Sequence, residues 1–387
     1  MKRYGNLFEQ ICDIENIRIA YHNAKKGKGW YKEVQEIDKD PEPYLKELQN
    51  LLKTHQYRTS QYEVFIKKEG RKERKIYKLP FFPDRVAQWA IMQVIEPYII
   101  KHLIVDTYSA IPGRGIHFGL NRLKEAMFND VKGCQYCLKI DAKHYYQSIN
   151  HEILKQKYRK LFKDQELLMV LDEIIDSVNT AEDEDLALIY LLEEDIDEAT
   201  GVSIGNYLSQ YSGNYYFSDF DHWMKEVKKV KHYFRYMDDI VIFAETKEEL
   251  HCLLEEIRVY FMTEMKLVIK QNYQIFPSYV RGVDYLGYRV FMDYVLLRKS
   301  TCIQMKRKMV AIREKCEAGN MMNYSEWCSI NSYDGWLKPC NTFRLRQKYI
   351  VPLKPYTEKY YITNIKKIKK EGKQHERLWN SQKHSQA

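Results

Sequence analysis

Two adjacent carboxylates, Asp238 and Asp239, lie inside the segment His232–Phe243, which reads HYFRYMDDIVIF. Apolar, aromatic and β-branched residues flank them on both sides, and this pattern predicts two antiparallel strands joined by a tight turn. Adjacent carboxylates repel each other and are poor strand residues, so we expect a positive partner to offset their charge. A divalent cation is the simplest candidate, since such ions prefer oxygen ligands and support metal-assisted catalysis.

A further carboxylate lies upstream in the chain. Asp141 ends the apolar run Cys137–Ile140 and precedes a polar segment. Acidic residues are therefore predicted at the ends of two separate strands. Two catalytic metal ions, held about 3.5–4 Å apart, need an arrangement of this kind, because one strand cannot supply all of their ligands.

Together with Asp141, the segment Tyr236–Asp239 resembles the catalytic boxes of bacterial reverse transcriptases. The resemblance implies that Asp141, Asp238 and Asp239 are catalytic and hold two Mg²⁺ ions, with Mn²⁺ as an alternative. It implies a further metal contact at Ala142 and makes Asp238 a firmer ligand than Asp239. The reaction would be two-metal nucleotidyl transfer.

The resemblance also assigns residues to the incoming nucleotide. Tyr146 matches the position of a bulky side chain under the sugar, which would exclude a 2′-hydroxyl; an ordinary packed aromatic residue is the alternative. Gly205 fits a loop that lets the backbone approach a nucleotide, and Gln210 belongs to the same motif. The variant formed by Ile204-Gly205 and Ser209-Gln210 looks like that of diversity-generating and defence-associated enzymes, the former of which copy with low fidelity.

Basic residues complete the predicted nucleotide site. The segments Ile76–Arg85 and Ser109–His117 resemble two fingers motifs, and this similarity assigns Lys78, Arg85 and Arg114 to nucleotide binding. Arg114 stands between two glycines, so its guanidinium could reach a triphosphate with little obstruction from the backbone.

Two further segments follow the catalytic hairpin. Lys266 and Lys270 are both candidates for the general acid that protonates pyrophosphate, and Lys270 is assigned to the nucleotide. The segment Gly282–Arg289 is similar to the primer-grip turn, which here contains Leu286, Gly287 and Tyr288. The order and spacing of all these motifs, over roughly residues 75 to 300, make the resemblance specific, since each motif alone is weak.

These motifs imply an α/β (α+β) right-hand polymerase. We expect a helical extension with part of the fingers at 1–75, fingers at 76–130, a palm at 131–298, a helical thumb at 299–365 and a basic tail at 366–387. Within the first region, a strand-turn-strand is predicted from Tyr62 to Leu79. Six residues there are predicted to be core or packing positions: Trp30, Tyr31, Tyr44, Leu45, Leu48 and Leu51.

Composition agrees with a nucleic-acid partner but does not require one. The 387 residues carry a net charge of +9 and include 32 tyrosines, and basic residues interleaved with aromatic ones suit phosphates and stacked bases. Many proteins are mildly basic without binding nucleic acid.

The sequence contains no apolar run long enough to cross a bilayer and no signal peptide at its start, so we expect a cytoplasmic protein without a membrane partner. Its eight cysteines are then expected to be reduced. Cys134 and Cys137 have a metal-like spacing, but no second pair follows at zinc-finger distance, and ordinary strand cysteines are expected.

One segment interrupts the predicted palm. Residues 182–198 are strongly acidic and contain no basic residue. A solvated loop, a surface for a partner and a flap that repels nucleic acid from a wrong path are the three interpretations.

The predicted function is RNA-directed DNA synthesis from a dedicated noncoding RNA, with a primer or cDNA strand, dNTPs and an accessory protein as partners, in antiphage defence. A diversity-generating retroelement enzyme is the main alternative. Template-independent or protein-primed synthesis, a non-catalytic RNA-binding scaffold and an RNA-dependent RNA polymerase are further alternatives, although Tyr146 argues against the last. The chain is expected to have no room for an RNase H, integrase or nuclease domain.

Overall fold

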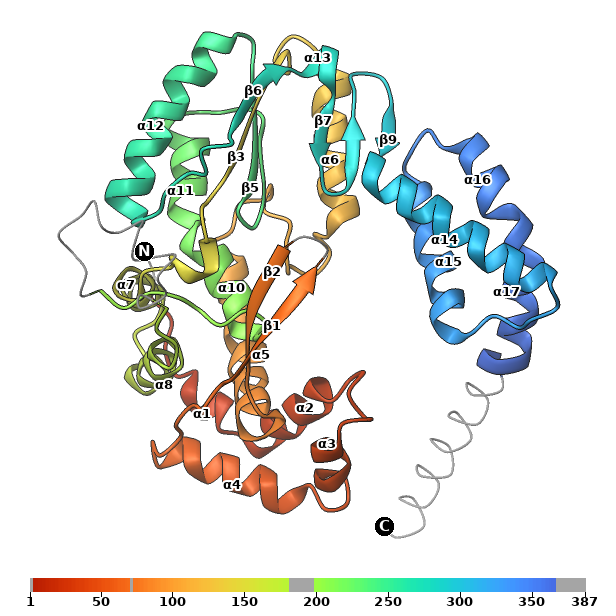
Figure 1. The fold of residues 1–387 in the computed structure, drawn as a ribbon. Helices are drawn as coiled ribbons and strands as arrows, with labels where there is room; N and C mark the ends of the chain where they lie inside the picture. Colours follow the sequence, from red (N-terminus) through yellow and green to blue (C-terminus); the bar gives the residue numbers. More distant parts are fainter. Residues whose placement is uncertain (1–2, 70–71, 181–197, 367–387) are drawn as a thin grey trace. The chain divides into compact units, whose positions relative to one another are not determined.

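The computed structural model describes residues 3–69, 72–180 and 198–366 (Figure 1). Within it the chain divides into two compact units. The first comprises Met1–Arg122 and Lys132–Phe276, and the second comprises Leu123–Val131 and Pro277–Ala387. The predicted boundaries of fingers, palm, thumb and tail remain predictions, and most of the acidic segment and of the basic tail lies outside the described residues.

Four helices begin the first unit: α1 (Phe8–Ile11), α2 (Ile14–Ala24), α3 (Lys32–Ile37) and α4 (Glu42–Lys53). Helix α4 buries Leu45, Leu48 and Leu52, whose spacing of three and four residues places them on one face. The core prediction for Leu45 and Leu48 is therefore confirmed.

The prediction for Trp30 is wrong. Its side chain is 73% exposed and meets only the edge of the Tyr31 ring. Trp30 lies in the turn that follows Gly27 and Gly29 and precedes α3, so it is outside the amphipathic pattern that orients the helical residues. An aromatic residue in such a turn has no helix face to direct it inward.

A β-hairpin and a long apolar helix follow. Strands β1 (Glu63–Glu69) and β2 (Lys72–Lys78) pair antiparallel, which confirms the predicted strand-turn-strand. The short helix η1 (Phe81–Arg85) leads into α5 (Val86–Ile100), most of whose apolar residues are buried, and α6 (Ile116–Asn129) comes next.

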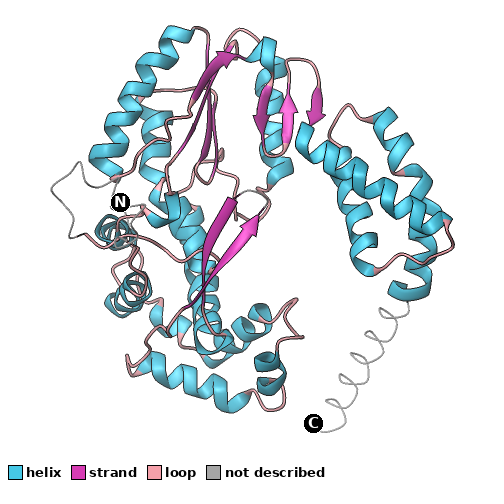
Figure 2. Cartoon of the chain, viewed as in Figure 1, coloured by secondary structure: helices cyan, strands magenta, loops and turns pink. Residues whose placement is uncertain are grey.

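A four-stranded sheet in the order β4-β5-β3-β6 carries the predicted catalytic segments (Figure 2). Its strands are β3 (Tyr136–Asp141), β4 (Tyr233–Tyr236), β5 (Asp239–Ala244) and β6 (Gln274–Pro277). The hairpin predicted around Asp238 is confirmed, because β4 and β5 pair antiparallel.

Among the helices of this region, Lys247–Met265 packs on β3 and β5. The elements are η2 (Tyr145–Gln147), α7 (His151–Leu161), α8 (Gln165–Asp176), α10 (Tyr207–Tyr216), α11 (Ser218–His222), η3 (Trp223–Val227) and α12 (Lys247–Met265). The helix predicted after Gly205 is thus α10.

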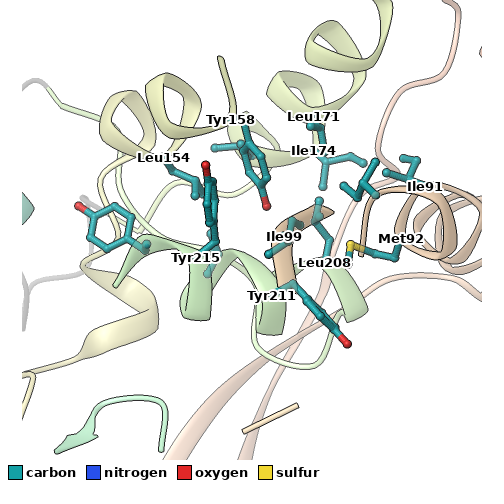
Figure 3. Close-up of a cluster of buried hydrophobic side chains, with 14 of the residues drawn as sticks. Ile91, Met92, Ile99, Leu154, Tyr158, Leu171, Ile174, Leu208, Tyr211 and Tyr215 are labelled. Carbon is teal, nitrogen blue, oxygen red and sulfur yellow. The ribbon is translucent and has the colours of Figure 1, made fainter. Parts of the chain in front are cut away.

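Apolar and aromatic side chains from α5, α7, α8 and α10 meet in one buried cluster (Figure 3). Tyr158 of α7 packs against Tyr215 of α10, and its hydroxyl bonds to Ser212 at 2.9 Å. Leu208 and Tyr211 extend the contact toward α5. The cluster fixes α10, and thereby the Gly205 loop, against the rest of the unit.

The second unit begins with a small sheet and continues with helices. Its elements are α13 (Ser278–Arg281), β7 (Val283–Tyr285), β8 (Tyr288–Val290), β9 (Val295–Leu297), α14 (Lys299–Glu317), α15 (Tyr324–Leu337), α16 (Phe343–Tyr349), η4 (Val351–Leu353), α17 (Lys354–Tyr360) and η5 (Tyr361–Ile365). The expectation that the chain becomes helical after residue 299 is confirmed. Across the described ranges, no helix is long and apolar enough to cross a membrane.

Candidate active site

The ends of strands β3 and β5 bring the predicted catalytic carboxylates together. The two strands pair antiparallel with Ile140 opposite Ile240 and Asp141 opposite Asp239. The isoleucines are buried, so the pattern changes from apolar to acidic at the same point on both strands. Directly opposite residues project to the same face of a sheet, and Asp141 and Asp239 therefore share one face.

Asp238 belongs to the two-residue turn that joins β4 to β5. Tyr236 pairs with Asp239, which leaves Met237 and Asp238 as the turn residues. Met237 has a φ of 54°, a left-handed conformation that is rare for a residue other than glycine. The surrounding structure must hold this turn, because such a conformation is not favourable by itself.

The carboxylates are close enough to perturb each other. Burial and the neighbouring Asp141, through its charge and a hydrogen bond, raise the pKa of Asp238 to about 7. Two carboxylates that share a site cannot both ionise easily without a cation. The raised pKa therefore marks a place where positive charge is needed.

Two lysines supply part of that charge. Lys270 Nζ donates to Asp141 Oδ1 at 2.7 Å, and Lys139 Nζ lies 3.1 Å from Asp239 Oδ1. A positive partner was expected for the adjacent pair Asp238 and Asp239. Lys139 is such a partner for Asp239, whereas Lys270 pairs with the neighbouring Asp141. The charge of Lys270 also lowers the pKa of Asp238, but by less than burial and Asp141 raise it.

The donor set suits a hard divalent ion, since all three side chains offer carboxylate oxygens. In the described ranges, however, no group of three acidic, histidine or cysteine side chains is already close enough to hold a metal. Lys139 and Lys270 contact carboxylate oxygens of Asp239 and Asp141 that a metal ion would use. Ala142 is buried next to this point in an isolated bridge with Ile269, and a metal contact there stays a prediction.

The electrostatics give a testable pH dependence. The folded pKa of Asp238, about 7, exceeds the usual value of 3.8. The protonated carboxyl is thus favoured by folding, and its stabilising contribution is lost as the pH rises toward and through 7. In EDTA, we expect Asp238→Asn to have a higher Tm than wild type at about pH 8, and a smaller advantage at about pH 5. Thermal unfolding at both pH values measures the difference, and an advantage independent of pH would contradict the assignment.

A fully buried arginine holds the turn from behind. Arg235 of β4 and Asp221 of α11 are both 0% exposed, and their side chains form an ion pair at 2.5 Å. Burial is the largest single influence on the pKa of Arg235 and lowers it, but the charge and hydrogen bonds of Asp221, with smaller contributions from Tyr233 and Tyr145, together raise the pKa above its usual value, so the arginine stays charged.

The same guanidinium reaches the turn backbone. Arg235 Nη1 donates to the carbonyl oxygen of Met237 at 3.0 Å and to Asn214 Oδ1 at 3.2 Å, and the Arg235 guanidinium lies over the Phe217 ring at 4.7 Å. Thr107 hydroxyl joins the network through Asp221 Oδ2 at 3.2 Å. The network therefore connects the strained Met237–Asp238 turn to α10, α11 and the loop that contains Thr107.

Comparison with known proteins identifies the chain. Residues 66–290, more than half of its length, match the family model described as reverse transcriptase (RNA-dependent DNA polymerase). The chain belongs to the reverse transcriptase family. The right-hand polymerase class inferred from the motifs is thereby supported, and the match includes both strands that carry the aspartates.

Other similarities are more distant. Protein YkfC of Escherichia coli K12 is 22% identical over 255 residues, which cover 59% of this chain and 65% of YkfC. Among solved structures, apo telomerase from Candida tropicalis gives a TM-score of 0.46 at 12% identity, with 81% of this chain and 59% of that chain covered. Telomerase from Candida albicans with a fragment of telomeric RNA gives a TM-score of 0.47 at 11% identity, with 81% of this chain and 62% of that chain covered.

Tyr146, which the reverse transcriptase resemblance places under the nucleotide sugar, lies beside the catalytic turn. Its hydroxyl is 3.5 Å from Met237 Sδ, and its ring packs against that of Tyr145. Both rings lie against α10 at Gly213, where a Cβ would be in ordinary van der Waals contact with Tyr145 at 3.4 Å and with Tyr146 at 3.5 Å. Tyr146 is therefore both packed and adjacent to the site.

The Gly205 motif lies at the start of α10. Gly205 has a φ of 113° and is exposed, with open space where a Cβ would stand. Gln210 is exposed on α10. A loop that needs a positive φ and remains open on its surface allows close approach of a ligand to the backbone.

The three fingers residues have contacts of their own. Lys78 pairs with Glu63 at 2.7 Å on the neighbouring strand, and Arg114 donates to the carbonyl of Ile104 at 2.9 Å. Burial lowers the pKa of Arg85, whose Nε has no hydrogen-bond partner in the described part of the chain. None of these contacts joins them to the aspartates, and their nucleotide roles stay predictions.

The two candidate general acids differ in position. Lys270 contacts Asp141, whereas Lys266, which ends α12 with a φ of 47°, pairs with Glu198. The structure therefore brings Lys270, and not Lys266, to the carboxylates. Glu198 is the last residue of the acidic segment 182–198, and the others lie outside the described residues.

The predicted primer-grip turn is a feature of the second unit. It joins β7 to β8, with left-handed φ angles of 52° at Leu286 and 85° at Gly287. The Tyr288 ring stacks on Trp336 with centroids 5.4 Å apart. A Cβ on Gly287 would lie 2.3 Å from Trp336 Cζ3, so this glycine is required by both backbone angle and packing.

We therefore expect Gly287→Ala to lower the unfolding free energy of the second unit by roughly 2 kcal/mol or more, through left-handed strain and the clash with Trp336. Gly335→Ala is the matched control, because it lies in α15 with open space around its Cβ. Alanine there should be neutral or stabilise by up to about 1 kcal/mol. Denaturant titration measures both variants, and equal effects would contradict the packing argument.

Sequence reasoning did not select Lys139, Arg235 or Asp221. One signal was available: Arg235 interrupts the apolar alternation of a strand whose neighbours Tyr233 and Phe234 are buried. A charged residue at such a position needs a buried partner. The partner could not be named from sequence, because Asp221 lies on a helix 14 residues upstream.

Proposed function

We propose that this reverse transcriptase family member is an RNA-directed DNA polymerase that extends a primer on an RNA template by two-metal nucleotidyl transfer. The observation that carries the proposal is the meeting of Asp141 and Asp238 at the ends of the catalytic strands, where the pKa of Asp238 is raised to about 7. Family membership gives the reaction class, and this carboxylate pair gives the place where a metal would be held.

Asp141, Asp238 and Asp239 would hold the ions, with Mg²⁺ as the expected metal and Mn²⁺ as a substitute. When bound, the ions supply a lowered pKa for the primer 3′-hydroxyl and neutralise the triphosphate. Lys270, once displaced from Asp141, remains near the reacting phosphates as a cation and proton donor. Arg235 keeps the turn in place, and so fixes the Asp238 carboxylate.

Tyr146 would select deoxynucleotides through its ring. We expect Tyr146→Ala to raise the ratio of rNTP to dNTP incorporation by about 10–100-fold, because the space for a 2′-hydroxyl opens. Tyr146→Phe keeps the ring and removes the hydroxyl that contacts Met237 Sδ, so it should retain wild-type discrimination. Single-nucleotide extension with each substrate measures the ratio. Unchanged discrimination in Tyr146→Ala would make the residue an ordinary packed aromatic.

We also propose that the template is a dedicated noncoding RNA and that the cDNA serves antiphage defence. The support is the Ile204-Gly205 and Ser209-Gln210 variant, which resembles that of defence-associated enzymes and equally that of diversity-generating enzymes. Sequencing the RNA and DNA that copurify with the protein from cells tests this role. A single enriched RNA with matching cDNA is expected, whereas mutated copies of a repeat would indicate the diversity-generating role.

The activity itself is tested by primer extension on an RNA template with Mg²⁺ and dNTPs. Product that depends on the RNA sequence, on dNTPs and on the metal supports the assignment. Product that does not follow the template would favour template-independent synthesis. Incorporation of rNTPs in preference to dNTPs would favour an RNA polymerase.

A further inference from the structure

The second unit contains a hollow of about 790 Å³ between β9, α14 and α16. Its size lies within the range of about 300–1,000 Å³ that is typical of small-molecule sites. Leu296 and Leu297 of β9 contribute apolar surface to it. One wall is fixed by Asn341, whose side-chain oxygen accepts from Val295 N at 3.0 Å and whose N donates to Val295 O at 2.8 Å.

Positive charge dominates this hollow. Lys306 of α14 and Arg344 and Lys348 of α16 line it, and no aspartate or glutamate is among its lining residues in the described ranges. The nearby Arg346 is different, because both its Nε and its Nη2 are bound to Asp334, at 2.5 and 2.9 Å. The cations of the hollow thus form a field that would attract an anion.

Two aromatic rings accompany these cations. Phe343 lines the hollow and is 76% exposed, the largest fraction among the exposed large apolar side chains of the described residues. Lys306 and Lys348 lie over the ring of Tyr349, at 5.9 and 5.7 Å from its centroid. Cations next to an exposed aromatic face match the two parts of a nucleotide, since phosphate needs positive charge and the base needs a ring to stack on.

We propose that this hollow binds an unpaired nucleotide of single-stranded RNA, with the base against Phe343 and the phosphate between Lys306, Arg344 and Lys348. A duplex does not suit the site, because paired bases are stacked on one another and cannot enter a concave surface to meet an aromatic ring. A protein partner would neutralise the three cations of the hollow only if its own contacting surface were acidic. The site would anchor the RNA that carries the template. The choice of RNA as the ligand rests on the proposed function.

The test measures binding without synthesis. Full-length protein is titrated against a short fluorescently labelled oligouridylate, and in parallel against a labelled RNA–DNA duplex, with anisotropy as the readout. Phe343→Ala should weaken binding of the single strand by about 5–150-fold, as expected for removal of one stacked base. Because Phe343 is largely exposed, this variant should fold. Phe343→Trp keeps an aromatic ring at this position, so it should bind the single strand about as tightly as the wild-type protein.

The charge variant is Lys306→Gln/Lys348→Gln, and its matched control is Arg307→Gln/Lys308→Gln, which removes two exposed cations from the same helix outside the hollow. The first should reduce the salt slope of single-strand binding by about 0.7 for each phosphate that the protein no longer neutralises. The control variant Arg307→Gln/Lys308→Gln should change the salt slope less.

Unchanged single-strand affinity in Phe343→Ala would overturn the proposal. Equal losses for single strand and duplex would also overturn it, because the residues would then belong to a general duplex-binding surface. Since no nucleotide is incorporated in this assay, its outcome is separate from that of the primer extension that tests the polymerase assignment.

Discussion

Asp238→Asn should reduce RNA-templated DNA synthesis by roughly 10³-fold or more. The substitution keeps the size of the side chain but removes the charge that the metal site needs. Asp238 is half-buried beside Asp141, and the charge of Lys270 lowers its pKa by less than burial and Asp141 raise it. The loss should therefore appear in kcat, with template binding retained. Primer extension at saturating dNTP measures it, with binding of the labelled template as the second readout.

The same substitution at the other carboxylates shows whether the effect is specific to the metal site. Asp141→Asn should be as severe, because Asp141 is the carboxylate that contacts Asp238. Asp239→Asn should lose less activity, because the reverse transcriptase resemblance makes Asp239 the weaker metal ligand. Asp293→Asn, an exposed carboxylate between β8 and β9, is the matched control and should retain activity. Wild-type synthesis by Asp238→Asn would show that the metal assignment is wrong.

Arg235→Met should destabilise the fold more than any of these substitutions. It leaves Asp221 as an uncompensated charge in a fully buried position, a change that typically costs about 3–5 kcal/mol. We expect the Tm to fall by about 10 °C. Arg159→Met is the control, because Arg159 and Asp172 form an ion pair at the surface, and such a pair contributes only about 0–1 kcal/mol.

Two further variants separate charge from position. Arg235→Met/Asp221→Asn removes both charges, so its loss of stability should be smaller than the sum of the two single losses. Arg235→Lys keeps a charge but cannot bond to Asp221 and the Met237 carbonyl together, since Lys lacks the planar fork. It should fold yet need more Mg²⁺ for half-maximal synthesis. A normal Mg²⁺ requirement in Arg235→Lys would limit the arginine to a structural role.

Stability and catalysis oppose each other at this turn. Met237 adopts a left-handed φ, and Asp238 is held next to another carboxylate; neither is favourable for folding. The buried Arg235–Asp221 pair and the packed helix α10 hold the turn nonetheless. This is the expected arrangement for a functional site, where local preferences are violated and the surroundings compensate.

The local elements and the chemistry of the site could be predicted from the order of the amino acids. The strands around Asp141 and Asp238 were predicted because largely apolar runs stop at the aspartates, and helices were predicted after residue 299, where α14 lies. The pairing of the two acidic segments could be inferred from their order along the chain, because they resemble family motifs. The local sequence pattern did not predict that Trp30 is exposed, because this residue lies in a turn.

The pairing of charges, by contrast, depends on tertiary packing. Lys139 and Asp239 are 100 residues apart and meet because β3 and β5 pair in one register, and Lys270 reaches Asp141 across 129 residues. Arg235 meets Asp221 only because α11 packs behind β4. These partners come from separate elements, and periodicity along the chain contains no information about them. The hollow around Phe343 arises in the same way, from the meeting of α14, α16 and β9.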